Sequence, residues 1–143
     1  MKKCFIAQSI ILFSGVLFAW STVASDYIKF TNNQAANPIT TPCFYGAIGF
    51  AVFYVFSLYI LFTQKNFLKL QKYLVIFLFA GTLFGWGNFI IELCRFYIFK
   101  NPTTCSGGFG SNPFLTPCFI GSLLYLLSFV VGTITYRKLT AKK

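Results

Sequence analysis

Histidine is absent from this chain, and only two residues, Asp26 and Glu92, carry a carboxylate. General acid–base catalysis and most metal sites depend on these side chains. The sequence also lacks a glycine-rich phosphate loop, a zinc motif and a Cys-x-x-Cys pair. We therefore expect no cofactor and no histidine or carboxylate metal site, and the sequence favours a protein that is not an enzyme.

Charge is scarce as well: 10% of the 143 residues are charged, whereas 57% are hydrophobic and 21% aromatic. A soluble domain carries about 25% charged residues, so this chain has too little polar surface to coat a globule in water. Four apolar runs approach the roughly 20 residues that cross a bilayer. They predict an all-α membrane four-helix bundle in one domain, residues 1–143, with spans over 5–24, 44–63, 73–93 and 119–136.

The basic residues are distributed unevenly around these runs. Nine of the twelve lie before the first run, between the second and third, or after the fourth: Lys2, Lys3, Lys65, Lys69, Lys72, Arg137, Lys138, Lys142 and Lys143. The positive-inside rule then predicts cytoplasmic termini and extracytoplasmic loops. We therefore expect no nucleic-acid partner despite the net charge of +10; the expected partners are the lipid bilayer and another membrane protein or a second copy of the chain.

Two segments of the sequence occur twice. "NPITTPCFYG" (37–46) and "NPFLTPCFIG" (112–121) agree at seven of ten positions, and "LFSGVLFAW" (12–20) resembles "LFAGTLFGW" (78–86). The offsets are 75 and 66 residues, so the second copy has nine additional residues in its loop. The pattern predicts two tandem helical hairpins, repeat one 1–66 and repeat two 67–143, related by a parallel pseudo-twofold along the membrane normal.

The first span also has the features of a signal peptide, with a basic start, an apolar stretch and small residues near Ser25. Such apolar regions usually run about 7–15 residues, and this one is longer. Its copy, the third span, is internal and cannot be a cleaved signal. Retention of the first span is therefore favoured, with cleavage as the alternative.

The repeated Thr-Pro-Cys-Phe sequence predicts the start of a helix. Thr41 and Thr116 are suitable N-caps, and a proline is favoured at the first helical position. Cys43 and Cys118 then fall in the first turn, where the helix dipole stabilises a thiolate.

Four of the five cysteines are expected outside: Cys43, Cys94, Cys105 and Cys118. An oxidising compartment favours disulfides, and three connectivities are possible. The favoured pairing joins Cys94 to Cys105 within the inserted loop and Cys43 to Cys118 between the repeats. The alternatives are thiol redox chemistry by these four cysteines, or a soft metal such as Cu(I) held by Cys43 and Cys118.

Four spans with cysteines outside are similar in layout to the membrane disulfide-generating oxidoreductases and to vitamin K epoxide reductase. The resemblance covers topology and implies transfer of electrons from thiols to a quinone. Both families use a Cys-x-x-Cys pair, which this chain does not contain.

Small residues spaced four apart let membrane helices approach closely. Gly81 and Gly85 have this spacing in the third span, and Gly15 and Ala19 are their counterparts in the first. We expect the first and third spans to pack against each other there.

The two carboxylates each precede a basic residue by three positions, Asp26 before Lys29 and Glu92 before Arg95. This spacing predicts ion pairs on one helix face at the membrane interface. Together these features predict a small, non-enzymatic integral membrane protein, a structural or interaction subunit with disulfide-stapled outer loops. The alternative is a thiol–disulfide redox protein or a soft-metal or small-solute transporter that uses the outer cysteines.

Overall fold

The computed structural model describes residues 2–32, 37–63, 66–98 and 113–141, and within them it contains helices and no strand. The elements are α1 (Lys2–Thr31), η1 (Pro38–Thr40), α2 (Pro42–Phe62), α3 (Phe67–Tyr97), η2 (Pro113–Leu115) and α4 (Pro117–Thr140), where η marks a short 3₁₀ helix. All four α-helices are long and apolar enough to cross a membrane. The prediction of four apolar helices is confirmed.

The helices α1 and α3 are longer than the predicted spans. α1 continues from Ala24 to Thr31, and α3 begins at Phe67 and ends at Tyr97. Hydropathy locates the part of a helix that suits lipid, whereas the hydrogen-bonded helix continues through polar residues on either side.

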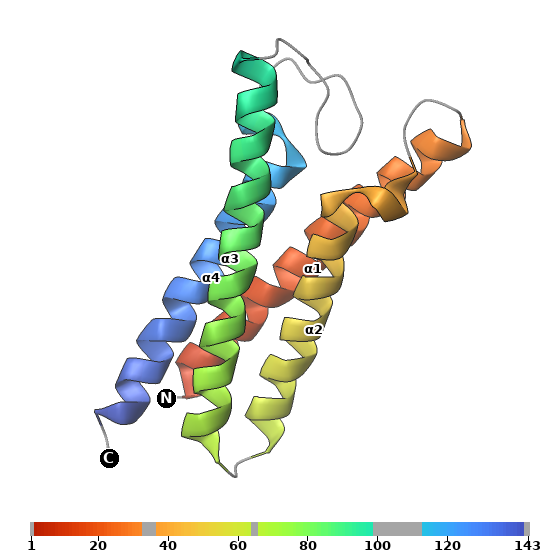
Figure 1. The fold of residues 1–143 in the computed structure, drawn as a ribbon. Helices are drawn as coiled ribbons and strands as arrows, with labels where there is room; N and C mark the ends of the chain where they lie inside the picture. Colours follow the sequence, from red (N-terminus) through yellow and green to blue (C-terminus); the bar gives the residue numbers. More distant parts are fainter. Residues whose placement is uncertain (1, 33–36, 64–65, 99–112, 142–143) are drawn as a thin grey trace.

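The helices form two hairpins that meet along a bundle (Figure 1). α1 packs mainly on α2, and α3 mainly on α4; α1 also packs along α4, and α2 along α3. Both termini lie at one end, which we call the terminal end, and α2 and α4 begin at the other, which we call the loop end. Toward the loop end the α1/α2 hairpin leans away from α3 and α4.

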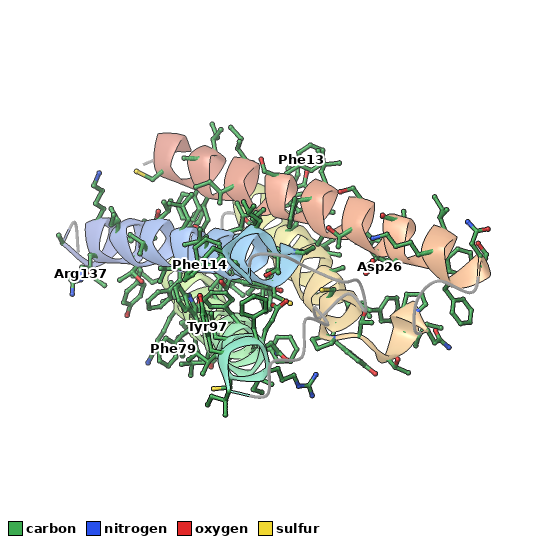
Figure 2. The ribbon with its side chains drawn as sticks, turned by 90° about the horizontal axis from the view of Figure 1, so that it is seen from above. Phe13, Asp26, Phe79, Tyr97, Phe114 and Arg137 are labelled. Carbon is green, nitrogen blue, oxygen red and sulfur yellow. The ribbon has the colours of Figure 1, made fainter. Side chains whose placement is uncertain are left out.

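Apolar side chains cover the outside of the bundle. Viewed from the loop end, Phe13 and Phe79 project away from the helix axes (Figure 2), and both are exposed. A surface of this kind is stable where lipid tails replace water. The exterior therefore fits a lipid bilayer.

The expected contact between the first and third helices at their small residues is wrong. Among the described residues, α1 and α3 meet instead near the terminal end, where the Phe5 and Phe67 ring centroids are 4.9 Å apart. A Cβ on Gly15 would meet the Phe50 ring of α2, and one on Gly81 would lie 2.7 Å from Cε1 of Tyr125 in α4. Gly85 likewise faces α4, at Ser122. These small residues make room for the partner within their own hairpin, because the bulky rings come from α2 and α4. Ala19, the fourth small residue, packs against the core and lines the pocket described below.

A buried pair of amides spans the diagonal between α1 and α3. Gln71 Nε2 donates to Gln8 Oε1 at 3.0 Å and to the carbonyl of Gly132 in α4 at 3.1 Å. Both glutamines are fully buried. Their hydrogen bonds tie three helices together in the half of the bundle nearest the terminal end.

Candidate functional site

α2 and α4 begin in the same way at the loop end. Each starts at a proline, Pro42 or Pro117, whose missing N–H is no loss in the first turn. Thr41 and Thr116 occupy the N-cap positions, but neither hydroxyl caps a backbone N–H. The Thr41 hydroxyl donates instead to the carbonyl of Pro38 at 2.6 Å. The sequence thus predicted the position of the cap correctly and its hydrogen bond wrongly.

These two helix starts bring Cys43 and Cys118 together. Their Sγ atoms are 3.8 Å apart, and the helix dipoles of α2 and α4 place partial positive charge near both. A disulfide has an S–S distance of about 2.05 Å, so the two sulfurs are in contact but not bonded. The predicted partners are neighbours, while the bond itself is not formed here.

Of the second predicted disulfide, Cys94–Cys105, only Cys94 lies within the described residues. Cys94 lies in the last turns of α3 as a free thiol, and Cys4 is free near the terminal end. Cys105 lies outside the described residues. Among the residues that are described, no three His, Cys, Asp or Glu side chains gather to hold a metal ion.

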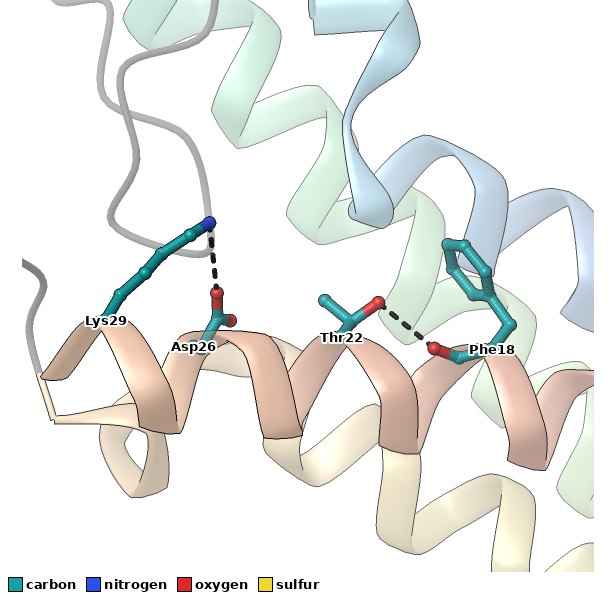
Figure 3. Close-up of polar contacts among 4 residues, drawn as sticks. All are labelled: Phe18, Thr22, Asp26 and Lys29. Atoms are coloured by element: carbon teal, nitrogen blue, oxygen red, sulfur yellow. Dashed lines mark hydrogen bonds and ion pairs between the residues drawn. The ribbon is translucent and has the colours of Figure 1, made fainter. Parts of the chain in front are cut away.

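Both carboxylates are buried, which corrects the expectation of exposed interfacial pairs. Asp26 is 2% exposed and Glu92 is 4% exposed. Lys29 Nζ lies 3.9 Å from Asp26 Oδ1 (Figure 3), so the predicted ion pair is present, with a buried carboxylate and a more exposed lysine. Glu92 Oε2 accepts a hydrogen bond from the Thr116 hydroxyl at 3.1 Å, and within the described part of the chain Arg95 makes no ion pair with it.

The carboxylates lie at the same end of the bundle as the thiol pair. Glu92 accepts a hydrogen bond from Thr116, two residues before Cys118, and the charges of Asp26 and Glu92 would disfavour a thiolate at Cys43. Asp26 Oδ2 is buried with no hydrogen-bond partner among the described residues. Ionisable side chains are costly within membrane helices and usually mark functional positions. The loop end therefore gathers two thiols and both carboxylates of the chain.

A pocket with a volume of about 50 Å³ lies between the two hairpins beside the thiol pair. All four α-helices line it: Phe18, Ala19, Thr22, Pro42, Cys43, Gly46, Phe50, Phe84, Gly85, Asn88, Pro117, Cys118, Gly121, Ser122 and Tyr125. Every lining residue except Ser122 has a counterpart in the lining 66 or 75 positions away. The pocket is mostly apolar, with a few hydroxyl, amide and thiol groups.

Two stacked rings form one part of the lining. The Phe50 and Tyr125 ring centroids are 3.9 Å apart with an interplanar angle of 23°. The Tyr125 hydroxyl donates to the carbonyl of Gly46 at 2.8 Å and so joins α4 to α2. This contact fixes the separation of the two helices just beyond the thiols.

Sequence reasoning missed the pocket, although the repeated segments contain a signal for it. Gly46 and Gly121 end these segments, and a Cβ on either residue would meet nothing within 4 Å. A glycine in the middle of a helix costs stability relative to alanine, so a pair at matched positions suggested either close packing or a void. Only the structure distinguishes the two.

Comparisons with protein-family models, with curated proteins and with solved structures give no match for this chain. The site must therefore be interpreted from its own chemistry.

Proposed function

We propose that this chain is a non-enzymatic integral membrane protein, a structural or interaction subunit whose two halves are joined at the loop end by a Cys43–Cys118 disulfide. The observation that carries the proposal is the 3.8 Å contact between the two sulfurs, which belong to separate hairpins. The apolar exterior of all four helices supports the membrane location.

Closing the bond requires the sulfurs to approach by about 1.8 Å, which side-chain rotation can supply. It forms by thiol–disulfide exchange: the thiolate of one cysteine attacks an external disulfide and displaces one external thiol, and the second cysteine then attacks the mixed disulfide and displaces the other. Two electrons and the two thiol protons pass to the external disulfide, which leaves as two thiols. With cysteines 75 positions apart, the chain-entropy model gives a stabilisation of about 4 kcal/mol.

The halves are proposed to be duplicated hairpins, residues 1–66 and 67–143, related by a pseudo-twofold axis through the pocket. The matched lining residues support this arrangement, since seven pairs at the two repeat offsets meet around one space. The packing of Gly15 on Phe50 and of Gly81 on Tyr125 supports it too, because both partners in each contact are shifted by those offsets.

We propose further that the terminal end faces the cytoplasm. Lys69, Lys72, Arg137 and Lys138 lie at or near that end, whereas Lys29 and Arg95 lie toward the loop end. The positive-inside rule favours this orientation. A thiol-reactive, membrane-impermeant label should therefore fail to reach a cysteine at position 69 in intact cells; outside labelling of that position would reverse the orientation.

A second function is favoured by one observation: both sulfurs line the pocket and lie near two buried carboxylates. Such a dithiol suits redox exchange with a bound acceptor, as the resemblance in layout to the thiol–quinone oxidoreductases implies. It also suits capture of a soft metal ion by two thiolates. The two proposed functions differ in one respect: in the structural subunit the Cys43–Cys118 disulfide stays formed, and in the redox protein it opens and closes.

The staple is tested by cutting the chain between α2 and α3. A protease site placed there, in a Cys94→Ser, Cys105→Ser background, yields two fragments that only Cys43 and Cys118 or the distant Cys4 can join. We expect the fragments from oxidising membranes to migrate together until a reductant is added, and to separate in the matched Cys118→Ser variant. Fragments that separate without reductant would overturn the staple, and a bond that opens and closes with the redox poise of the membrane would favour the redox protein.

A further inference from the structure

Four exposed basic side chains gather at the terminal end of the bundle. Lys69 and Lys72 lie three positions apart near the start of α3, and Arg137 and Lys138 lie in the last turn of α4. α3 and α4 pack along each other, and the start of α3 and the end of α4 both lie at the terminal end (Figure 1). The four charges therefore belong to one end of a single helix pair, and we call them the basic cluster.

The protein supplies no acidic side chain to balance the basic cluster. Its two carboxylates, Asp26 and Glu92, lie near the opposite ends of α1 and α3, and Lys29 already pairs with Asp26 there. Lys138 Nζ donates to the Cys4 sulfur at 3.8 Å, which is a weak acceptor. The carboxylate that would neutralise these cations is missing from their end of the molecule, so the counter-charge comes from its surroundings.

Two tyrosines mark the depth of the basic cluster in the bilayer. Tyr73 follows Lys72 and is exposed, and Tyr136 precedes Arg137 and is partly exposed. Tyrosine is enriched at the boundary between lipid tails and headgroups. The neighbouring basic side chains therefore lie at the level of the headgroups, where their long stems let the charge reach a phosphate.

We infer that the basic cluster binds anionic phospholipids through the phosphate and the net negative charge of their headgroups. Arginine holds a phosphate through two parallel N–H bonds, and lysine holds it as a point charge. The acyl chains then lie along the exposed apolar faces of α3 and α4, where Ile76 and Ile134 are one turn from the cluster. This inference goes beyond the proposed function, because neither the disulfide nor the orientation of the protein requires a preferred lipid.

The test measures lipid binding to the full chain in a nonionic detergent by native mass spectrometry. Phosphatidylglycerol and phosphatidylcholine are titrated separately, because both contain a phosphate and only the first has a net negative charge. We expect phosphatidylglycerol to bind at least about fivefold more tightly, the effect of one basic side chain near a lipid surface. This preference should weaken as the salt concentration rises. Equal binding of the two lipids would overturn the inference.

Arg137 and Arg95 provide a matched comparison. Both are exposed and lie in the last turn of their helix, Arg137 at the terminal end and Arg95 toward the loop end. Arg137→Gln should weaken the binding of phosphatidylglycerol by about fivefold, and Arg95→Gln should leave it unchanged. An equal loss in the two variants would overturn the assignment of the lipid to the terminal end.

Two multiple variants separate charge from folding. With Lys69→Gln, Lys72→Gln, Arg137→Gln and Lys138→Gln combined, the two lipids should bind equally. With Lys69→Arg, Lys72→Arg and Lys138→Arg combined, the charge is kept and the preference should persist. A preference that survives in the glutamine variant, or that disappears in the arginine variant, would overturn the role of the charges.

A final arm distinguishes a lipid from a soluble phosphate. Glycerol phosphate carries the charged group of the headgroup without acyl chains, so an excess of it should leave bound phosphatidylglycerol in place. Displacement of the lipid by glycerol phosphate would show a site for soluble phosphates and would overturn the assignment of a lipid. All arms use the protein with its thiols reduced, so their outcome does not depend on the Cys43–Cys118 disulfide.

Discussion

The helices are joined in different ways at the two ends of the bundle. Toward the terminal end, Gln71 bonds to Gln8 and to Gly132, and the helices close around these amides. Toward the loop end, Gly46 and Gly121 face empty space, and the hairpins meet through two thiols 3.8 Å apart. Glycine permits a close contact in one place and preserves a void in the other.

This difference separates a region held by hydrogen-bonded amides from a region that surrounds a pocket. Polar groups between membrane helices hold them together when every group finds a partner. Of the four polar atoms of these amides, Gln71 Nε2 and Gln8 Oε1 are paired, whereas Gln8 Nε2 and Gln71 Oε1 lack partners among the described residues. At the loop end, hydroxyl, amide and thiol groups line the pocket.

With the thiols reduced, the largest effect is expected for Gly81→Leu. A Cβ at Gly81 would lie 2.7 Å and 2.9 Å from the Tyr125 ring and 3.1 Å from the Phe53 ring. The Tyr125 ring is held by its stack on Phe50 and by its hydrogen bond to Gly46. We expect a loss of about 3 kcal/mol in the free energy of unfolding. Gly121→Leu on α4 should instead change it by less than about 1 kcal/mol, toward greater stability. Unfolding in mixed micelles measures both, and equal losses would remove the contrast between packed and open glycines.

A smaller effect is expected for Gln71→Leu. It leaves Gln8 and the Gly132 carbonyl without their donor, at a cost of about 1–2 kcal/mol. The double variant Gln8→Leu, Gln71→Leu removes both amides and should recover part of that loss. If the double variant is as unstable as the sum of the two single ones, the amides do not act as a pair.

The next effect compares the two hairpins. Thr116→Val removes a hydrogen bond to the Glu92 carboxylate and should cost about 1 kcal/mol. Thr41→Val removes a bond to the carbonyl of Pro38, three residues earlier, and should cost less because that local bond does not join two of the long helices. Thermal unfolding of both variants checks the order, and a larger loss for Thr41→Val would contradict it.

The smallest effect is expected for Cys118→Ser in reducing conditions. Sulfur and oxygen differ little in size, and no bond is lost, so the free energy of unfolding should change by less than about 0.5 kcal/mol. Under oxidising conditions the same variant should fall short of the wild type by the stabilisation of the staple, about 4 kcal/mol. If the variant loses the same free energy of unfolding in both conditions, the contact between the thiols and not a disulfide stabilises the wild type.

The sequence predicted those features that depend on local rules. The helix starts at Pro42 and Pro117 follow from the chemistry of the first turn, and the four apolar helices follow from their length. The approach of Cys43 to Cys118 was inferred from matched positions in two similar segments.

Features that depend on a partner were predicted poorly. The spacing of Gly81 and Gly85 indicated a close contact but not which helix supplies it, and α4 supplies it because its Tyr125 ring fills the space. The burial of Asp26 and Glu92 likewise depends on how neighbouring segments cover them, which the three-residue spacing to a basic residue does not encode.

The pairing of helices bears on how the protein is made. α1 packs mainly on α2 and α3 mainly on α4, while α1 and α3 meet through a few side chains near the terminal end, Phe5 on Phe67 and Gln8 to Gln71. Each hairpin can therefore leave the insertion machinery with its main contact already satisfied by its nearest neighbour along the chain, at a low cost in loop-closure entropy. Docking of the finished hairpins then comes second, as a lateral association within the bilayer. The pocket and the thiol pair come into existence only at that late step.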